Sequence, residues 1–166
     1  MKTLKTIRVL ALLAAVGGLA AAGCQAPAPP AAPAPPDYRA ELEPALDTFI
    51  DVWNDKQYDK LNGAFTENFK RAGPDFSANS RDEMIEAMRK VHATYPDLHI
   101  AKNATAFDKD VGFVQWTATG TSTAEDGTQA AMTVKGATML RYAGGKISEE
   151  WVYFDPSPMT SPPAQQ

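Results

Sequence analysis

Apolar residues in the first half of the chain recur at the spacing of amphipathic helices. Over Tyr38–Asn54 they occupy one helical face, which consists of Leu42, Ala45, Leu46, Phe49, Ile50 and Trp53. A second helical pattern opens with a Ser-x-x-Glu capping box at Ser80 and runs to about Tyr95, where Pro96 ends it. Between them the sequence predicts a short helical turn over Tyr58–Gly63 and then a short extended piece.

The apolar period changes from that of a helix to that of a strand after Asp97. Four long strands are predicted, over Leu98–Asp108, Val111–Thr121, Thr128–Tyr142 and Lys146–Asp155. Glycine-containing turns separate the last three strands. Helices followed by consecutive strands indicate an α+β domain with an antiparallel meander, over residues 37–158. We expect the Pro- and Ser-rich tail 159–166 to be disordered.

The first 36 residues have a different composition and predict export. Residues 1–23 read as a signal peptide, with three cationic residues before the apolar run Val9–Ala22. That run is shorter than the about 20 residues that span a bilayer. The alternative to a lipid-attached protein is an ordinary secretory signal cleaved near Ala22. Residues 25–36 are almost entirely Pro and Ala, so they favour an extended polyproline tether that cannot pack a core.

The end of the signal peptide, Ala21-Ala22-Gly23-Cys24, resembles the lipobox of bacterial lipoproteins. The resemblance implies that Cys24 is acylated, becomes the first residue and anchors the domain in the membrane of the cell envelope. Gln25 follows in place of the Asp that retains such proteins in the inner membrane. In a bacterium with two membranes, this favours the periplasmic face of the outer membrane.

Composition and charge exclude several classes of function. The chain has 16 basic and 20 acidic residues, and three of the basic ones lie in the signal peptide, which leaves 13 − 20 = −7. We therefore expect no nucleic-acid binding. A single cysteine excludes an internal disulfide, and two histidines without an acidic cluster suggest no metal site. No phosphate loop or nucleotide-binding glycine pattern is present, so no cofactor is expected.

Three stretches in order, Tyr95–Leu98, Trp116–Thr121 and Gly145–Asp155, resemble the SnoaL-like polyketide cyclase family. This family lies in the nuclear-transport-factor-two-like superfamily, which includes ketosteroid isomerases. The resemblance covers about Ala40–Asp155. It implies a cone-shaped fold, in which a strongly curved antiparallel sheet wraps around N-terminal helices and encloses a pocket. Members with known chemistry move protons next to a carbonyl without a cofactor, and SnoaL uses an Asp as acid and base.

The same resemblance places Trp151 and Asp155 in the pocket wall. Asp155 is the candidate general acid/base, because an aromatic pocket raises the pKa of a carboxyl group. The alternative is that Asp155 only caps the strand end. His92, on the apolar face of the second helix, is either a second acid/base or a hydrogen-bonded core residue. The candidate pocket-lining residues are Trp53, Tyr95, Trp116, Trp151 and Tyr153.

Two functions remain open at this stage. The first is binding of a small apolar ligand without turnover, and the second is cofactor-free proton transfer on a carbonyl compound with Asp155 as base. A homodimer built on the sheet is compatible with either. Lys135 and Arg141 share one face of the third long strand, but the sequence does not decide whether that face meets the pocket.

Overall fold

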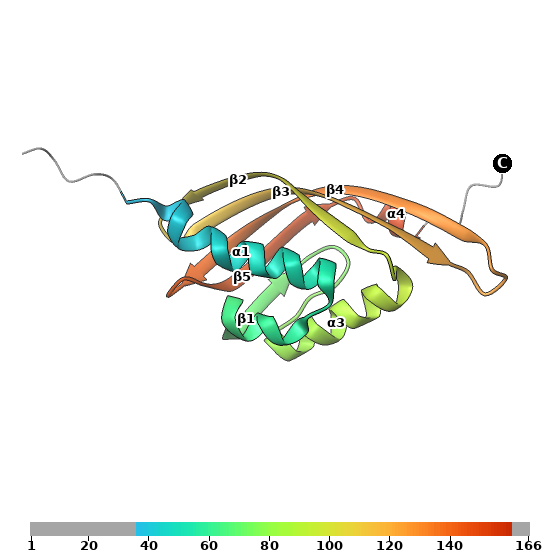
Figure 1. Cartoon of the computed structure of the whole chain (residues 1–166), viewed down its shortest axis with the longest axis horizontal. Coiled ribbons are helices and arrows are strands. Elements are labelled where there is room, and N and C mark those ends of the chain that lie inside the picture. The colour runs from blue at the N-terminus through green and yellow to red at the C-terminus, as the bar shows by residue number, and fades with distance from the viewer. Residues whose placement is uncertain (1–35, 161–166) are drawn as a thin grey trace, which may run out of the picture. The chain divides into compact units, whose positions relative to one another are not determined.

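The computed structural model describes residues 36–160 (Figure 1). By its internal contacts the chain divides into Met1–Ala34 and Pro35–Gln166, and all described residues belong to the second unit. The predicted signal peptide 1–23, Cys24, the linker up to residue 35 and tail residues 161–166 lie outside the described part. No helix of residues 36–160 combines the length and the apolar character needed to cross a membrane.

The described elements are four α-helices, one 3-10 helix and five strands. Their order is α1 (Tyr38–Asp55), η1 (Tyr58–Lys60), α2 (Leu61–Ala64), β1 (Phe65–Ala72), α3 (Arg81–Thr94), β2 (His99–Asp108), β3 (Val111–Thr123), β4 (Gln129–Ala143), β5 (Lys146–Phe154) and α4 (Ser157–Thr160). The fold is α+β, as predicted, and the predicted helices and strands are present within a few residues of their expected ends. Helix α4 was not predicted, and it crosses the expected boundary between the domain and the tail at residue 158.

Both long helices have side-chain caps at their N-termini. The Asp37 carboxylate accepts a hydrogen bond from Ala40 N at 3.2 Å and caps α1. The Ser80 hydroxyl accepts from Glu83 N at 3.1 Å and caps α3. In a capping box the Glu side chain also accepts a hydrogen bond from the backbone N–H of the capping Ser. Here the Glu83 carboxylate accepts instead from the preceding residue, Asn79 N, at 2.8 Å. The cap is therefore shared between two residues that precede the helix.

The five strands form one sheet in the order β1-β5-β4-β3-β2. Strands β2 to β5 are the predicted antiparallel meander. Strand β1 joins the free edge of β5 in parallel, so the sheet is mixed. The hydrophobic pattern could not predict this pairing, because β1 is short and is separated from β5 by most of the domain.

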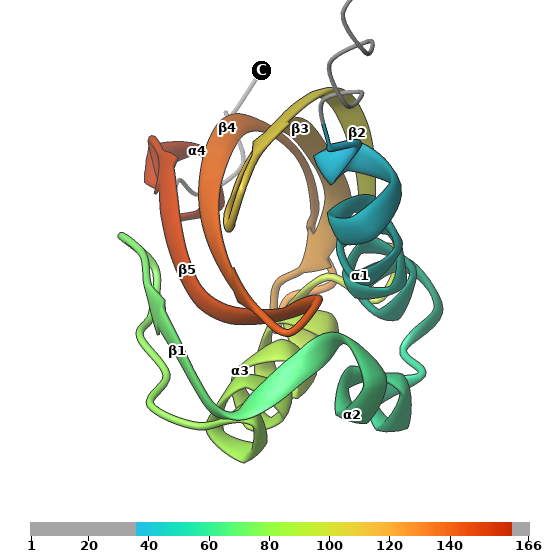
Figure 2. The same ribbon diagram turned by 90° about the vertical axis from the view of Figure 1, so that its left-hand side faces the viewer.

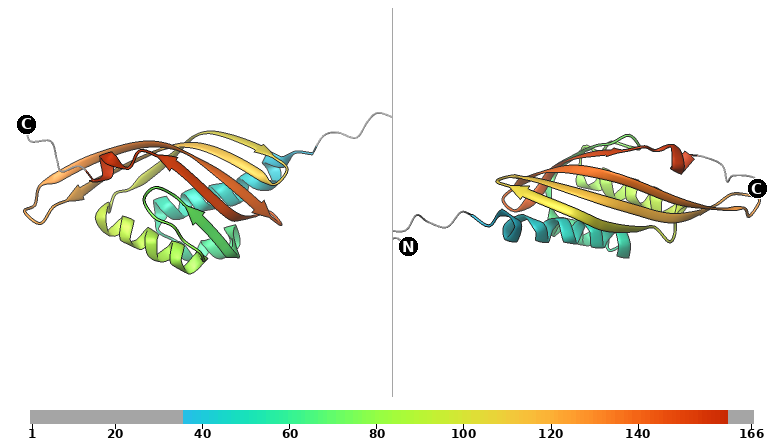
Figure 3. Two further views of the ribbon diagram at one scale, coloured as in Figure 1. Left: turned by 180° about the vertical axis from the view of Figure 1, so that it is seen from behind. Right: turned by 90° about the horizontal axis from the view of Figure 1, so that it is seen from above.

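The sheet curves strongly, and α1 and α3 lie on its concave side (Figure 2). Even-numbered residues of β3 and β4 face the helices, and Val114, Val134 and Leu140 among them are buried in the core. Odd-numbered residues of the same strands form the convex face, which no described helix covers (Figure 3).

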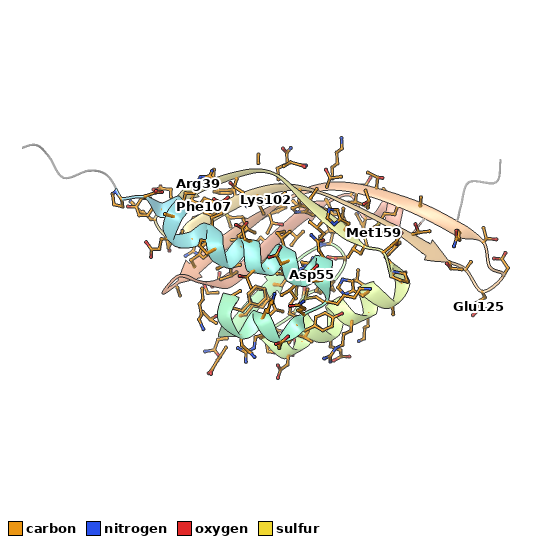
Figure 4. All side chains as sticks on the ribbon, in the orientation of Figure 1. Arg39, Asp55, Lys102, Phe107, Glu125 and Met159 are labelled. Carbon is orange, nitrogen blue, oxygen red and sulfur yellow. The ribbon has the colours of Figure 1, made fainter. Side chains whose placement is uncertain are left out.

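Charged side chains connect the first turns of α1 to β2 (Figure 4). The Arg39 guanidinium lies 2.9 Å from the Glu43 carboxylate and 5.4 Å from the centre of the Phe107 ring. Lys102 of β2 lies 3.0 Å from the same Glu43 carboxylate and also pairs with Asp47. These contacts hold α1 across the concave side of the sheet, where the helix covers the core.

Candidate functional site

A cavity of about 80 Å³ lies between the concave face of the sheet and helices α1 and α3. Its wall is mainly apolar, with α1 contributing Phe49 and Trp53, and β3 contributing Trp116. Two of the predicted pocket residues, Trp53 and Trp116, therefore line the cavity. A space with apolar walls and few polar groups is the usual form of a small-molecule site.

Trp116 can reach across the concave face because its neighbour on β4 is a glycine. Trp116 and Gly136 are directly paired in the β3–β4 register. A Cβ atom on Gly136 would lie 2.3 Å from the Trp116 ring, which is far inside van der Waals contact. The indole Nε1 donates to Thr138 Oγ1 at 2.9 Å, which fixes the plane of the ring. Trp116 thus forms a fixed wall of the cavity.

One side of the cavity is polar and is built on β1 and the loop that follows it. The Arg71 guanidinium lies 2.9 Å from the Asp75 carboxylate and 3.6 Å from the centre of the Phe76 ring. It also donates to the Phe76 carbonyl oxygen. The side chain of Arg71 is 4% exposed, and both Arg71 and Asp75 line the cavity. A buried cation is therefore held in place by its own loop.

Glu150 of β5 faces this cation inside the protein. Arg71 and Glu150 are paired residues in the parallel β1–β5 register, and Glu150 Oε2 lies 3.4 Å from Arg71 Nε. Neither of these two atoms has a hydrogen-bond partner among the described residues. Burial raises the pKa of Glu150 to about 7, since desolvation outweighs the opposing effect of the Arg71 charge. A carboxyl group with this pKa can hold or release a proton near neutral pH.

A β-bulge at the start of β5 sets the direction in which Glu150 points. Tyr142 pairs with Ile147 but Arg141 pairs with Glu149, so Ser148 is the extra residue. After the bulge, Glu150, Val152 and Phe154 point into the cavity. The remaining residues of the strand, from Glu149 onward at every second position, point to the convex face.

Asp155, the predicted acid/base, does not line the cavity. It is exposed after the end of β5, and its carboxylate accepts hydrogen bonds from Ser157 N at 2.9 Å and Ser157 Oγ at 2.6 Å. These bonds hold the pKa of Asp155 below its usual value, which is the reverse of what the prediction requires. The alternative interpretation, a carboxylate that caps the chain end of the strand, fits this geometry.

Trp151 and Tyr153 were also predicted to line the pocket, and they lie on the convex face instead. Tyr153 is 60% exposed. Trp151 is half-buried under the Arg141 guanidinium, whose carbon lies 6.0 Å from the ring centre. Arg141 and Lys135 therefore belong to the convex face and do not reach the cavity. The prediction took the inward face of β5 from the family pattern and chose the wrong one.

His92 is a buried connector between helical segments. One ring nitrogen, Nε2, lies 2.8 Å from the Trp53 carbonyl oxygen, and Nδ1 lies 2.8 Å from the Tyr58 hydroxyl. The carbonyl can only accept, so Nε2 carries the proton and Nδ1 accepts from Tyr58. Burial lowers the pKa of His92 and favours this neutral form. Both nitrogens are occupied, so the geometry fits the second of the two alternatives, a hydrogen-bonded core residue, and not the acid/base role.

Tyr95 lies outside the cavity, in the wall of a second hollow of about 500 Å³. This outer hollow lies among α3, the Pro74–Phe76 loop and α4. The Tyr95 ring is buried, and its hydroxyl donates to the Met159 carbonyl oxygen at 2.9 Å. Tyr95 thus fixes α4 beside the hollow.

The polar groups of the cavity, Arg71, Asp75, Thr138 and Glu150, were missed as site residues. One signal in the sequence could have found Glu150. Alternation groups it with Val152 and Phe154, which makes that face of β5 the more apolar one and marks Glu150 as a lone acid within it. No comparable signal exists for Arg71, because its burial depends on the pairing of β1 with β5. Within residues 36–160, no three metal-ligating side chains are grouped as a metal site requires.

Comparison with solved structures places the domain among known proteins. IdmH from Streptomyces antibioticus, a candidate polyketide cyclase, is 17% identical with a TM-score of 0.63, over 70% of this chain and 94% of that one. AclR from Streptomyces galilaeus, a candidate hydroxylase, is 19% identical with a TM-score of 0.61, over 72% and 92%. A hypothetical protein with a ketosteroid isomerase-like fold from Catenulispora acidiphila, solved with trimethylamine, is 15% identical with a TM-score of 0.63, over 70% and 89%.

At these identities the structures show a shared fold, and they confirm the predicted cone architecture. A search of curated proteins gives no significant match. The sequence profile described as SnoaL-like polyketide cyclase matches residues 43–161, which is more than half of the chain. The chain therefore belongs to the SnoaL-like polyketide cyclase family.

Proposed function

We propose that this domain binds a small, mainly apolar molecule in the cavity between α1, α3 and the sheet. The observation that carries the proposal is the mainly apolar cavity with one buried polar pair, Arg71 and Glu150, at its side. The family relationship supports it, and so does the related Catenulispora protein that holds trimethylamine. Apolar contact would supply affinity, and the polar pair would orient the ligand.

Native mass spectrometry tests this proposal directly. A soluble version of residues 37–166 contains every described helix and strand, and would be purified without detergent. The expected result is a native mass above the denatured mass, with the excess lost on Trp116→Ala, which removes a wall of the cavity. A matched control is Trp151→Ala on the convex face. Binding that survives Trp116→Ala and is lost with Trp151→Ala would contradict the proposal.

A second candidate function is cofactor-free proton transfer of the cyclase or isomerase type, now with Glu150 as the acid/base. The observation that favours it is a carboxyl group of raised pKa in the cavity. It predicts that the protein accelerates exchange of protons next to the carbonyl of a bound ketone in deuterated water. Glu150→Gln should abolish the acceleration while the ketone still binds. If the unmodified protein does not raise the rate of exchange above the rate in buffer, proton transfer is excluded and ligand binding is the function that remains.

We also propose a position for the domain in the cell, on the basis of the N-terminal sequence. We infer that residues 1–23 are removed and that lipid on Cys24 anchors the domain, on the resemblance to a lipobox. Acyl chains would hold it at the membrane surface. In cells that express the full chain, the protein should fractionate with membranes, and Cys24→Ala should prevent acylation. A mature N-terminus without lipid would contradict the anchor.

The convex face of the sheet supports a further proposal, a homodimer. An apolar row crosses the sheet through paired residues, namely Ala72, Trp151, Met139, Phe113 and Ala106. Phe113 is 51% exposed within it. A contiguous apolar patch of this kind is typical of a protein interface.

A further inference from the structure

The cavity and the outer hollow are next to each other and share part of their walls. Asp75, Val91 and Met159 line both spaces. Val91 comes from α3, and Met159, labelled in Figure 4, comes from α4. We refer to these three residues as the junction. The junction consists of one flexible methionine, one valine and Asp75, whose carboxylate is paired with the Arg71 guanidinium at 2.9 Å.

We propose that the cavity and the outer hollow form one binding site, which takes an elongated, uncharged molecule with its oxygen-bearing end in the cavity and its apolar chain in the hollow. The proposal rests on the function proposed above, because it specifies the shape and charge of the ligand for the same cavity.

The volumes require a ligand that extends beyond the cavity. At about 80 Å³ the cavity is smaller than the roughly 150 Å³ space that binds a single benzene ring in another protein. It therefore accepts only a few non-hydrogen atoms. The outer hollow, at about 500 Å³, lies within the usual range for ligand sites. Its wall is largely apolar, with Pro74, Phe76, Ala87 and Pro156 among its residues.

The charges of the cavity favour an uncharged ligand. The Arg71 guanidinium is already paired with Asp75 at 2.9 Å, so no unbalanced positive charge is left to attract an anion. Burial raises the pKa of Glu150 to about 7, so below that pH the group is mostly neutral and offers no carboxylate to a cation. A neutral carboxyl group can donate one hydrogen bond, which suits a carbonyl or hydroxyl oxygen.

The charged side chains of the outer hollow are already paired within the protein, and Asp75 is paired with Arg71 at 2.9 Å. The lysine of the hollow, Lys90, is exposed, and the ammonium group lies 2.7 Å from the Glu86 carboxylate on the same helix. The junction itself can adapt, because methionine is flexible and its backbone is held by the Tyr95 hydroxyl. The Met159 side chain could therefore move aside while α4 stays in place.

The experiment is a series of straight-chain methyl ketones, from 2-butanone to 2-undecanone, titrated into the soluble version of residues 37–166. Fluorescence of Trp53 and Trp116 in the cavity wall reports binding. We expect affinity to rise by roughly fourfold for each added CH₂, and to continue rising for chains too long for the cavity alone. The carboxylate and the alkylamine of matching length should bind at least roughly tenfold more weakly than the ketone.

Val91→Phe places a ring in the junction and should separate the two parts of the site. We expect it to lower the affinity of 2-undecanone by roughly tenfold or more, and to leave 2-butanone almost unchanged. Ala93→Phe is the matched control, since it adds the same ring at an exposed position of α3. If Val91→Phe impairs folding, Ala87→Leu, which narrows only the outer hollow, replaces it and should have the same selectivity for long chains.

The outcomes separate this inference from the proposed function. If short ketones bind but affinity stops rising once the cavity is filled, the two-part site is wrong and the small-ligand function stands. If Val91→Phe and Ala87→Leu leave 2-undecanone unaffected, the two-part site is also wrong. Equal or tighter binding of the carboxylate or the amine would overturn the uncharged ligand. Failure of every ketone, amine and carboxylate to bind would contradict both the inference and the proposed function.

Discussion

Glu150 is a buried carboxyl group whose ionisation works against folding. Its pKa is raised to about 7 from an unfolded value of 4.5, so the folded chain keeps a proton that the unfolded chain loses between these values. The stability from this group is complete below pH 4.5 and is lost as pH rises to about 7. Over this pH range the free energy of unfolding falls by up to about 3 kcal/mol because of this group. Glu150→Gln, which cannot ionise, should remove this loss.

Urea unfolding at pH 5 and pH 8 measures the effect. Between these values the unmodified protein should lose up to about 3 kcal/mol more stability than the Glu150→Gln variant. The control is Glu149→Gln, on the opposite face of β5, which should follow the unmodified protein. If all three proteins have the same pH dependence, Glu150 is not a buried group of raised pKa.

His92 is expected to act on stability through its two hydrogen bonds. His92→Phe keeps a ring in the core but leaves the Trp53 carbonyl and the Tyr58 hydroxyl without a partner. We expect a loss of roughly 2–4 kcal/mol at pH 8, against about 1 kcal/mol for Tyr58→Phe, which removes one bond. Chemical denaturation of both variants measures the two losses. Equal losses, or none, would contradict the connector role.

The pH dependence of His92 has the opposite sign to that of Glu150. Burial lowers its pKa from 6.5, so the unfolded chain binds the proton more readily. The stability from neutral His92 is complete above pH 6.5 and is lost as pH falls below that value. The stability difference between the unmodified protein and His92→Phe should therefore shrink in acid.

Residue type alone could not distinguish a catalytic titratable group from a structural one in the sequence. His92 and Asp155 are both titratable groups near aromatic residues, and a catalytic role was predicted for each. The structure separates them by partner: His92 has both nitrogens bonded, and Asp155 is bonded to Ser157 in the exposed chain after β5. Glu150 differs from both because its oxygen Oε2 is buried without a hydrogen bond.

At the scale of elements, strand pairing between β3 and β4 shapes the cavity. Gly136→Ala would place a methyl group 2.3 Å from the Trp116 ring and force the indole to move. We expect a loss of roughly 1–3 kcal/mol, together with changed tryptophan fluorescence and weaker ligand binding. The measurements are urea unfolding and emission spectra. Gly63→Ala in α2 is the control, because nothing lies within 4 Å of its Cβ, and it should change little.

Local patterns predicted the elements better than their pairing. The helix faces of α1 and α3 and the meander of β2 to β5 follow from apolar spacing, which each segment carries within itself. The parallel pairing of β1 with β5 depends on two segments far apart in sequence. The bulge at Ser148 depends on how many residues of β4 and β5 oppose each other. Because Arg71 and Glu150 meet only through these features, the polar side of the cavity could not be predicted from spacing.

At the scale of the whole molecule, the domain has an apolar surface on each side of one sheet. The concave side is covered by α1 and α3 and holds the cavity. The convex side carries the apolar row through Phe113 and no described helix covers it (Figure 3). In a two-fold symmetric dimer each copy would cover the row of the other, and a stable interface needs about 800 Å² from each partner.

The oligomeric state of the soluble version therefore tests the convex face. We expect a dimer at micromolar concentration by sedimentation velocity, because the row supplies a continuous apolar surface. Phe113→Lys should weaken the dimer by roughly a hundredfold or more, since symmetry brings two like charges into the centre of the interface. Thr123→Lys, on the same face of β3 but ten positions further along the strand, should leave the dimer intact. A monomer at all concentrations would show that the row serves a different partner or none, and a dimer that Phe113→Lys does not affect would place the interface on another surface.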